Sequence, residues 1–194
     1  MVNIALFGTS ADPPTSAHQT ILNWLSYHYD HVAVWASDNP FKSHPTSLEH
    51  RSKMLRLLIE EIARPNISLY QAFSSRRTLE TVEQARQHWD SQVDLTLVIG
   101  SDLVNQMPRW YQIDKLLKQV QLLVVPRPGY AIDEAGVEEL RKLGAEVAIA
   151  DLEAPAVSST AYRENGDTEV LTPPVEDYIH KEHLYACQDA APSR

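Results

Sequence analysis

The first eighteen residues constrain the fold of this chain more than any other stretch. An apolar run over residues 2–7 is cut off by Gly8, and its short length favours a buried strand over a buried helix. Ser16 is followed three residues later by Gln19, which is the spacing of a capping box, and an apolar helical stripe comes next. We therefore expect a strand, a tight loop and a helix that begins near Ser16.

His18 falls in the first turn of that expected helix. Backbone N–H groups without partners and the positive end of the helix dipole meet there, so the position suits an anion and disfavours a charged imidazole. A neutral His18 would donate a hydrogen bond to a phosphate rather than act as a base. A lone histidine in such a unit is structural in many α/β proteins, so the pattern alone leaves both interpretations open.

Apolar runs alternate with helical patterns along the rest of the chain. Thr46 and Glu49 form a second capping-box pattern, and Gly144 is the expected C-terminal cap of a later helix. The expected strands are 31–36, 67–70, 94–99, 121–125 and 146–150, and the expected helices are 16–29, 46–62, 78–88, 113–120 and 132–143.

Strands spaced by such helices predict an α/β fold that is Rossmann-like and doubly wound, with a mostly parallel sheet, helices on both faces and a small C-terminal helical segment. Open sheets of this type bind ligands beyond the carboxyl ends of their strands. The loops after Phe7, Ala36, Ile99 and Val125 should therefore lie together around a ligand.

Two stretches near opposite ends of the chain carry a resemblance. Residues 8–18 resemble the G-x-x-x-D-P-x-[HT]-x-G-H signature of the nucleotidyltransferase superfamily, which is related to the class I aminoacyl-tRNA synthetases. Residues 157–163 are similar to the I-S-S-T-x-[IV]-R motif of the nicotinate mononucleotide adenylyltransferases. Two motifs of one family in the expected order are hard to produce by chance.

Further matches narrow the resemblance to the nicotinate mononucleotide adenylyltransferases. Residues 100–102 resemble the family's G-x-D, residues 108–111 its P-x-W-Y, and residues 127–130 its R-P-G-Y. The C-terminal P-x-x-V-x-x-Y-I segment is matched within residues 171–179, and Thr78 stands in a looser match to the T-x-x-T-L region. The resemblance covers residues 2–185.

The resemblance implies adenylyl transfer from ATP to nicotinate mononucleotide, giving nicotinate adenine dinucleotide and pyrophosphate in NAD biosynthesis. The attacking group is already a phosphate anion, so positioning and charge neutralisation are the main tasks of the protein. Mg²⁺ would arrive with ATP, since it binds mainly through phosphates and water, and no protein metal site is expected. The implied catalytic residues are His18, Thr15, Arg163 and Lys42.

The remaining implied contacts divide between the two substrates. Trp110 would stack on the pyridine ring, and the backbone near Thr78 would recognise the nicotinate carboxylate. The implied nucleotide-binding residues are Gly8, Ser10, His18, Gly100, Asp102, Ser158, Ser159, Thr160 and Arg163, and the implied mononucleotide-binding residues are Trp110, Thr78 and Arg127.

The chain departs from the family pattern at several positions. Ala11 replaces the usual Phe, Thr15 the first histidine and Ala17 a glycine, and the loop over residues 39–44 differs from P-P-H-K. A methyl group at Ala17 would narrow the approach of a substrate to the backbone. Two alternatives therefore stay open: another adenylyl- or cytidylyltransferase, with nicotinamide mononucleotide or phosphopantetheine as acceptor, and a non-catalytic nucleotide sensor. The presence of His18 and Arg163 favours the enzyme.

Composition limits the other classes of function. The net charge of −9 argues against a nucleic-acid partner, although a local basic pocket is compatible with it. Cys187 is the only cysteine, and no apolar segment is long enough to span a bilayer. We expect a cytoplasmic protein with one nucleotidyltransferase domain over residues 1–187 and a disordered tail over residues 188–194. The sequence is also compatible with a homo-oligomer.

Overall fold

The computed structural model describes residues 1–185, which fold around one six-stranded sheet. All neighbouring strands pair in parallel, in the order β3-β2-β1-β4-β5-β6. The strands are β1 (Val2–Thr9), β2 (His31–Ala36), β3 (Ile67–Leu69), β4 (Val93–Gly100), β5 (Gln121–Val125) and β6 (Val147–Ile149).

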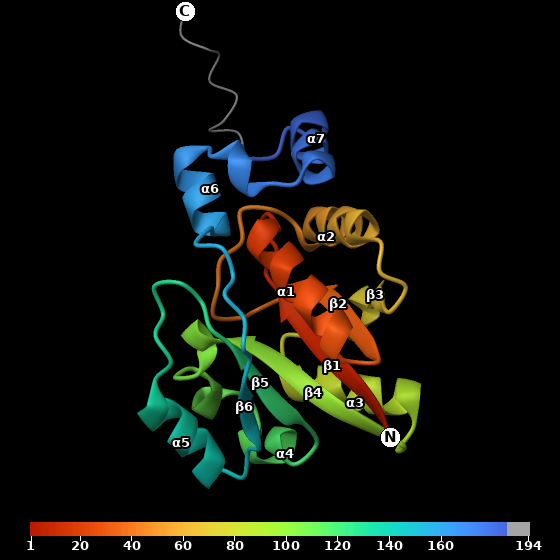
Figure 1. Cartoon of the computed structure of the whole chain (residues 1–194), viewed down its shortest axis with the longest axis vertical. Helices are drawn as coiled ribbons and strands as arrows, with labels where there is room; N and C mark the ends of the chain where they lie inside the picture. The colour runs from red at the N-terminus through yellow and green to blue at the C-terminus, as the bar shows by residue number, and fades with distance from the viewer. Residues whose placement is uncertain (186–194) are drawn as a thin grey trace, which may run out of the picture.

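Helices cover both faces of the sheet. Helices α1 and α2 pack with the apolar cluster on one face, and α3, α4 and α5 pack with the cluster on the other. In Figure 1 α6 and α7 lie beyond α1 and α2, and α7 contacts α2. The helices are α1 (Ser16–His28), α2 (Leu48–Ile62), α3 (Thr78–Trp89), α4 (Ile113–Leu117), α5 (Glu134–Lys142), α6 (Ser159–Asn165) and α7 (Pro173–Lys181). This architecture confirms the predicted doubly wound α/β fold.

Strand β1 shows why the first apolar run contains no alternating polar residues. Ile4 and Leu6 face the cluster that holds α3, whereas Ala5 and Phe7 face the cluster that holds α1. A parallel strand that is buried on both faces must be apolar at consecutive positions. The strand also continues through Gly8 to Thr9, and glycine is needed at position 8 because a Cβ there would lie about 2.5 Å from the Trp35 ring.

The sheet order creates the place where a ligand can bind. From β1 the chain runs outward to β2 and β3, and it then returns to place β4 on the other side of β1. The loops that follow β1 and β4 diverge at this switch point. A crevice therefore opens beyond the carboxyl ends of these strands.

Several helix boundaries differ from the predictions. Helix α4 ends at Leu117 rather than residue 120, and α5 begins at Glu134 because the Asp133 side chain accepts the Gly136 N–H as its N-cap. Gly144 has φ +104°, in agreement with its predicted place at the end of α5. The predicted domain boundary at residue 187 and the tail over residues 188–194 lie outside the described residues.

Helix α2 does not begin where the capping-box pattern placed it. Its N-cap is Ser47, whose hydroxyl accepts the N–H of His50 at 3.3 Å, so the prediction of a cap at Thr46 is wrong. Thr46 is buried, and its carbonyl accepts a hydrogen bond from Nε of Arg51 at 3.1 Å. This contact holds Thr46 outside the helix.

Candidate active site

A cavity of about 430 Å³ opens at the switch point of the sheet. Its walls come from the loops after β1, β2, β4 and β5 and from the segment that enters α6. Most of the site residues implied by the resemblance line it. They are Gly8, Ser10, Thr15, His18, Lys42, Gly100, Asp102, Arg127, Ser158, Ser159, Thr160 and Arg163.

His18 is oriented by the cap of α1. The N-cap is Thr15, so the predicted Ser16–Gln19 capping box is wrong. The Thr15 hydroxyl accepts the N–H of Ala17 at 3.3 Å, and the Thr15 N–H donates to Nδ1 of His18 at 3.0 Å. Because Nδ1 accepts this hydrogen bond, the neutral imidazole carries its hydrogen on Nε2, which lies 2.9 Å from the Thr9 hydroxyl.

The electrostatic surroundings keep His18 neutral. Burial, followed by the positive charges of Arg127 and Lys42, lowers the pKa of His18 from 6.5 to about 4. The ring is therefore uncharged near pH 7, and its Nε2–H is a donor that faces the Thr9 hydroxyl in this structure. The first turn of α1 thus presents a neutral donor next to the free end of the helix.

Thr15 lines the cavity, and it also has a structural task within helix α1. Its side chain is buried and takes part in the α1 cap. The structure therefore gives Thr15 the task of orienting His18, and its direct contact with a phosphate stays a prediction.

Asp102 and Arg127 form an ion pair in the wall of the cavity. Nη1 of Arg127 lies 2.8 Å from Oδ2 of Asp102, and the Arg127 N–H donates to the Ser101 hydroxyl at 2.9 Å. Gly100 is needed for this arrangement, since a Cβ at that position would lie 2.4 Å from Oδ1 of Asp102. The carboxylate and the guanidinium are thus fixed at the ends of β4 and β5.

The loop that carries Lys42 forms another side of the cavity. Both Lys42 and His44 line it. Burial lowers the pKa of Lys42, Asp102 opposes this shift, and Arg127 and Arg163 add to it. Several cationic groups therefore surround one cavity in a chain whose net charge is −9.

The hydroxyl residues that open α6 are engaged within the protein. Ser158 is the N-cap and accepts the Ala161 N–H at 3.0 Å, whereas the Ser159 hydroxyl donates to the Pro13 carbonyl at 2.6 Å. Arg163 donates from Nη1 to the carbonyl of Asp12 at 2.5 Å. These contacts fasten α6 to the loop that follows β1.

Arg163 also has a second partner on its own helix. Its Nη2 lies 3.3 Å from the Thr160 hydroxyl. The guanidinium is therefore held from two sides at the wall of the cavity.

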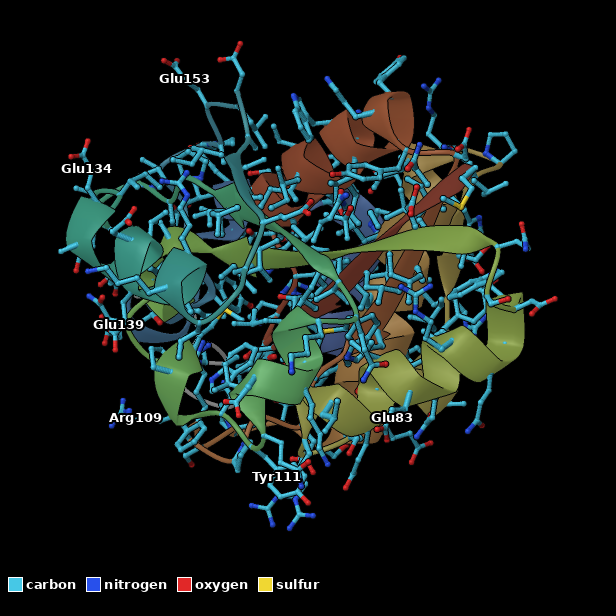
Figure 2. All side chains as sticks on the ribbon, turned by 90° about the horizontal axis from the view of Figure 1, so that it is seen from below. Glu83, Arg109, Tyr111, Glu134, Glu139 and Glu153 are labelled. Atoms are coloured by element: carbon cyan, nitrogen blue, oxygen red, sulfur yellow. The ribbon has the colours of Figure 1, made fainter. Side chains whose placement is uncertain are left out.

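Trp110 and Thr78 do not line this cavity. Trp110 is half-buried against the cluster on the α3 side of the sheet, and Thr78 is the first residue of α3. The two segments meet where the Arg77 guanidinium stacks over the Tyr111 ring at 4.2 Å. Figure 2 shows Tyr111 pointing outward at this edge of the molecule. The segments that carry Trp110 and Thr78 are thus in contact outside the cavity.

Two buried charged residues that support the cavity walls were not among the predicted site residues. Asp12 is 1% exposed, and Arg51 is 2% exposed. Nη1 of Arg51 donates to the carbonyls of Ser10 at 2.9 Å and Ser37 at 2.8 Å, so it ties together the loops after β1 and β2. A signal existed for Arg51, because it lies one turn before the buried Met54 on the apolar face of α2.

The departures from the family pattern lie where they can affect the cavity. Ala11 lines it, is fully buried and has φ +47°, a left-handed conformation that is uncommon for a residue with a side chain. Ala17 also lines the cavity, as its expected effect on substrate approach requires.

Within residues 1–185, no three His, Cys, Asp or Glu side chains gather as metal ligands. The carboxylates that line the cavity already have partners: Asp102 pairs with Arg127, and Asp12 accepts a hydrogen bond from Tyr185. Nor does this part of the chain contain a helix that is long and apolar enough to cross a membrane.

Comparisons with known proteins agree with this geometry. The cytidylyltransferase-like family model matches residues 6–165. A "probable nicotinate-nucleotide adenylyltransferase" of Synechocystis sp. is 42% identical, with 95% of this chain and 99% of the relative aligned. The nicotinate-nucleotide adenylyltransferase of Bacillus subtilis is 29% identical over the same shares of both chains.

A solved structure shows the same fold at lower identity. The Plasmodium falciparum nicotinic acid mononucleotide adenylyltransferase complexed with NaAD has a TM-score of 0.80 and 22% identity, covering 96% of this chain and 98% of that chain. The family model and the 42% identical relative together show that this chain belongs to the cytidylyltransferase-like family and, within it, to the nicotinate-nucleotide adenylyltransferases.

Proposed function

We propose that this protein transfers the adenylyl group of ATP to nicotinate mononucleotide, producing nicotinate adenine dinucleotide and pyrophosphate for NAD biosynthesis. One observation carries the proposal: a cavity at the switch point of the sheet gathers His18, Lys42, Arg127 and Arg163 in a chain of strongly negative net charge. This cavity suits a polyanion such as ATP. The activities named for the relatives from Synechocystis and Bacillus subtilis agree with it.

The reaction requires the protein to position two anions and to neutralise charge. The phosphate of the mononucleotide attacks the α-phosphorus of ATP, a new P–O bond forms, and the bond to pyrophosphate breaks. His18 would donate from Nε2 to a phosphate oxygen, and Lys42 and Arg163 would balance the charge that develops on the leaving group. No general base is needed, since the nucleophile is already ionised.

Magnesium would enter with ATP. The cavity carboxylates Asp12 and Asp102 have protein partners, so the ion would be held mainly by phosphate oxygens and water. When bound, it supplies positive charge at the phosphates. The side chains of this chain remain responsible for the orientation of the reacting groups.

The mononucleotide would extend from the cavity toward the region of Trp110 and Thr78. Tryptophan offers a flat face for a pyridine ring, and the start of α3 offers backbone N–H groups to a carboxylate. These features support recognition of the acid rather than the amide.

Pyrophosphate release provides the direct test. The protein would be assayed with ATP and Mg²⁺ together with either nicotinate or nicotinamide mononucleotide at equal concentration. We expect strong preference for the acid. Similar rates with both acceptors would contradict the assignment of acid specificity, and no release with either would contradict the adenylyltransferase itself.

A further inference from the structure

Tyr185 reaches from the end of the described chain into the first sequence motif. Its hydroxyl donates to Oδ1 of Asp12 at 2.5 Å, a contact between residues 173 positions apart. Its ring meets the ring of Tyr162 edge-on, with centroids 5.7 Å apart and an interplanar angle of 89°. Because Tyr162 is fully buried, the side chain of Tyr185 is held at both its ring and its hydroxyl.

Asp12 connects the segments that carry two of the proposed phosphate-binding cations. Its backbone carbonyl accepts the hydrogen bond from Arg163, and its Oδ2 lies 3.4 Å from Nδ1 of His44, two residues beyond Lys42. The Asp12 side chain is almost completely shielded from solvent. A shift of Asp12 would therefore move the hydrogen-bond acceptor of Arg163 and the ion-pair partner of the loop that carries Lys42.

The tyrosine is suited to hold the carboxylate. Burial and the hydrogen bond to Asp12 raise the pKa of Tyr185, so the phenol keeps its proton and remains a donor. Tyr185 also lines a second cavity of about 450 Å³, and Arg163 lines both cavities. The hydrogen bond from Tyr185 to Asp12 thus joins the wall of the second cavity to the wall of the first.

We propose that Tyr185 is a positioning residue for adenylyl transfer, which fixes Asp12 and, through it, Arg163 and the Lys42 loop. This inference rests on the proposed function. Loss of the hydroxyl would leave a buried carboxylate oxygen without its donor, and such an oxygen must be satisfied by movement of the loop or by entry of water. Either change would displace the groups that face the ATP phosphates.

Tyr185→Phe tests the proposal because it removes the hydroxyl and keeps the ring that packs on Tyr162. We expect kcat to fall by at least about tenfold, since small displacements of positioned groups have large effects on rate. The KM for nicotinate mononucleotide should change by less than about twofold, because its ring-binding region lies elsewhere. Both constants would come from steady-state kinetics on variants whose folding is checked by thermal unfolding.

Tyr178→Phe is the matched control. The Tyr178 hydroxyl lies 2.8 Å from Nδ1 of His50 in the same C-terminal part of the chain, so this variant also loses one tyrosine hydrogen bond. Its kcat should stay close to that of the parent protein. In an Arg163→Lys background, Tyr185→Phe should lower kcat by a smaller factor than it does in the parent protein, since both changes act on one linked set of contacts.

Three results would overturn the proposal: a kcat for Tyr185→Phe close to the parent value, equal losses in the Tyr178→Phe control, or failure of Tyr185→Phe to fold. A fourth result would do the same: losses in kcat that are strictly additive between Tyr185→Phe and Arg163→Lys. These outcomes are distinct from failure of the proposed function, in which the parent protein itself would form no dinucleotide.

Discussion

His18, Asp102 and Arg163 are each oriented by a contact within the protein. The Thr15 N–H sets the imidazole, Arg127 pairs with the carboxylate, and the Asp12 carbonyl receives the guanidinium. Groups that are already in place need little reorganisation when charge develops during a reaction. The individual residues therefore favour catalysis by positioning and electrostatics.

His18 should make the fold sensitive to acid. Its pKa is about 4 in the folded protein and about 6.5 in an unfolded chain, so between these values the unfolded state binds more protons. The free energy of unfolding should therefore fall as the pH falls from about 6.5 toward about 4. Urea unfolding across this range should show a smaller decrease for His18→Asn than for the parent protein. Equal pH dependence in both proteins would contradict the assignment of a neutral, buried imidazole.

Trp110 should affect one substrate only. If its ring stacks on the pyridine, Trp110→Ala should raise the KM for nicotinate mononucleotide about tenfold, because stacking and apolar contact are both lost. ATP affinity should change little, since Trp110 does not line the cavity that holds His18. Steady-state kinetics with each substrate varied in turn would measure both effects. Equal weakening of both substrates would contradict the stacking role.

Sequence motifs located these residues but could not supply their partners. His18 and Arg163 stand in recognisable patterns, whereas the role of Asp12 depends on His44 and Tyr185, which lie far away in the sequence. Burial of a charged group is set by tertiary contacts. For this reason the cavity residues were predictable, and the network behind them was not.

At the scale of the element, the sequence pattern did not identify the N-cap residue of either α1 or α2. Two adjacent hydroxyl residues stand at the start of each helix, Thr15–Ser16 at α1 and Thr46–Ser47 at α2, and by sequence either member could serve as N-cap. Tertiary contacts make the choice: His18 completes the cap at Thr15, and Arg51 holds the Thr46 carbonyl outside α2. The existence of both helices was predictable from their apolar stripes, but their first residues were not.

Loss of the α1 cap should lower both the free energy of unfolding and kcat. Thr15→Ala removes the hydroxyl that accepts the Ala17 N–H and should lower the free energy of unfolding by about 1 kcal/mol. The variant also loses the Thr15 hydroxyl that lies 3.2 Å from Nδ1 of His18, so the ring is less firmly placed and kcat should fall by at least about tenfold. Thr15→Ser keeps the hydroxyl and serves as the control, with near-parent values expected for both quantities. Normal turnover in a folded Thr15→Ala protein would show that the cap does not position His18.

The cavity gathers several cationic groups, although the chain as a whole is acidic. Figure 2 shows Glu134, Glu139 and Glu153 pointing outward, whereas His18, Lys42, Arg127 and Arg163 line the cavity. The parallel sheet gathers the loops that carry these groups at one edge. The order of strands explains why residues from both ends of the chain meet there.

Arg51 should stabilise the folded protein, because its guanidinium bridges the loops after β1 and β2. Arg51→Met leaves the carbonyls of Ser10, Ser37 and Thr46 without their donor, which should lower the free energy of unfolding by about 2–4 kcal/mol. Arg51→Lys keeps the charge but not the planar set of donors, so it should recover only part of this loss. Chemical unfolding would measure both values. A near-parent stability for Arg51→Met would contradict the bridging role.

The central claim is that the α-phosphorus of ATP is transferred to the mononucleotide. It is tested most directly with ATP labelled at that phosphorus, incubated with the protein, Mg²⁺ and nicotinate mononucleotide, followed by separation of the products. The account predicts that the label appears in nicotinate adenine dinucleotide as fast as pyrophosphate forms. Label that remains in ATP, or that appears only in AMP, would contradict it.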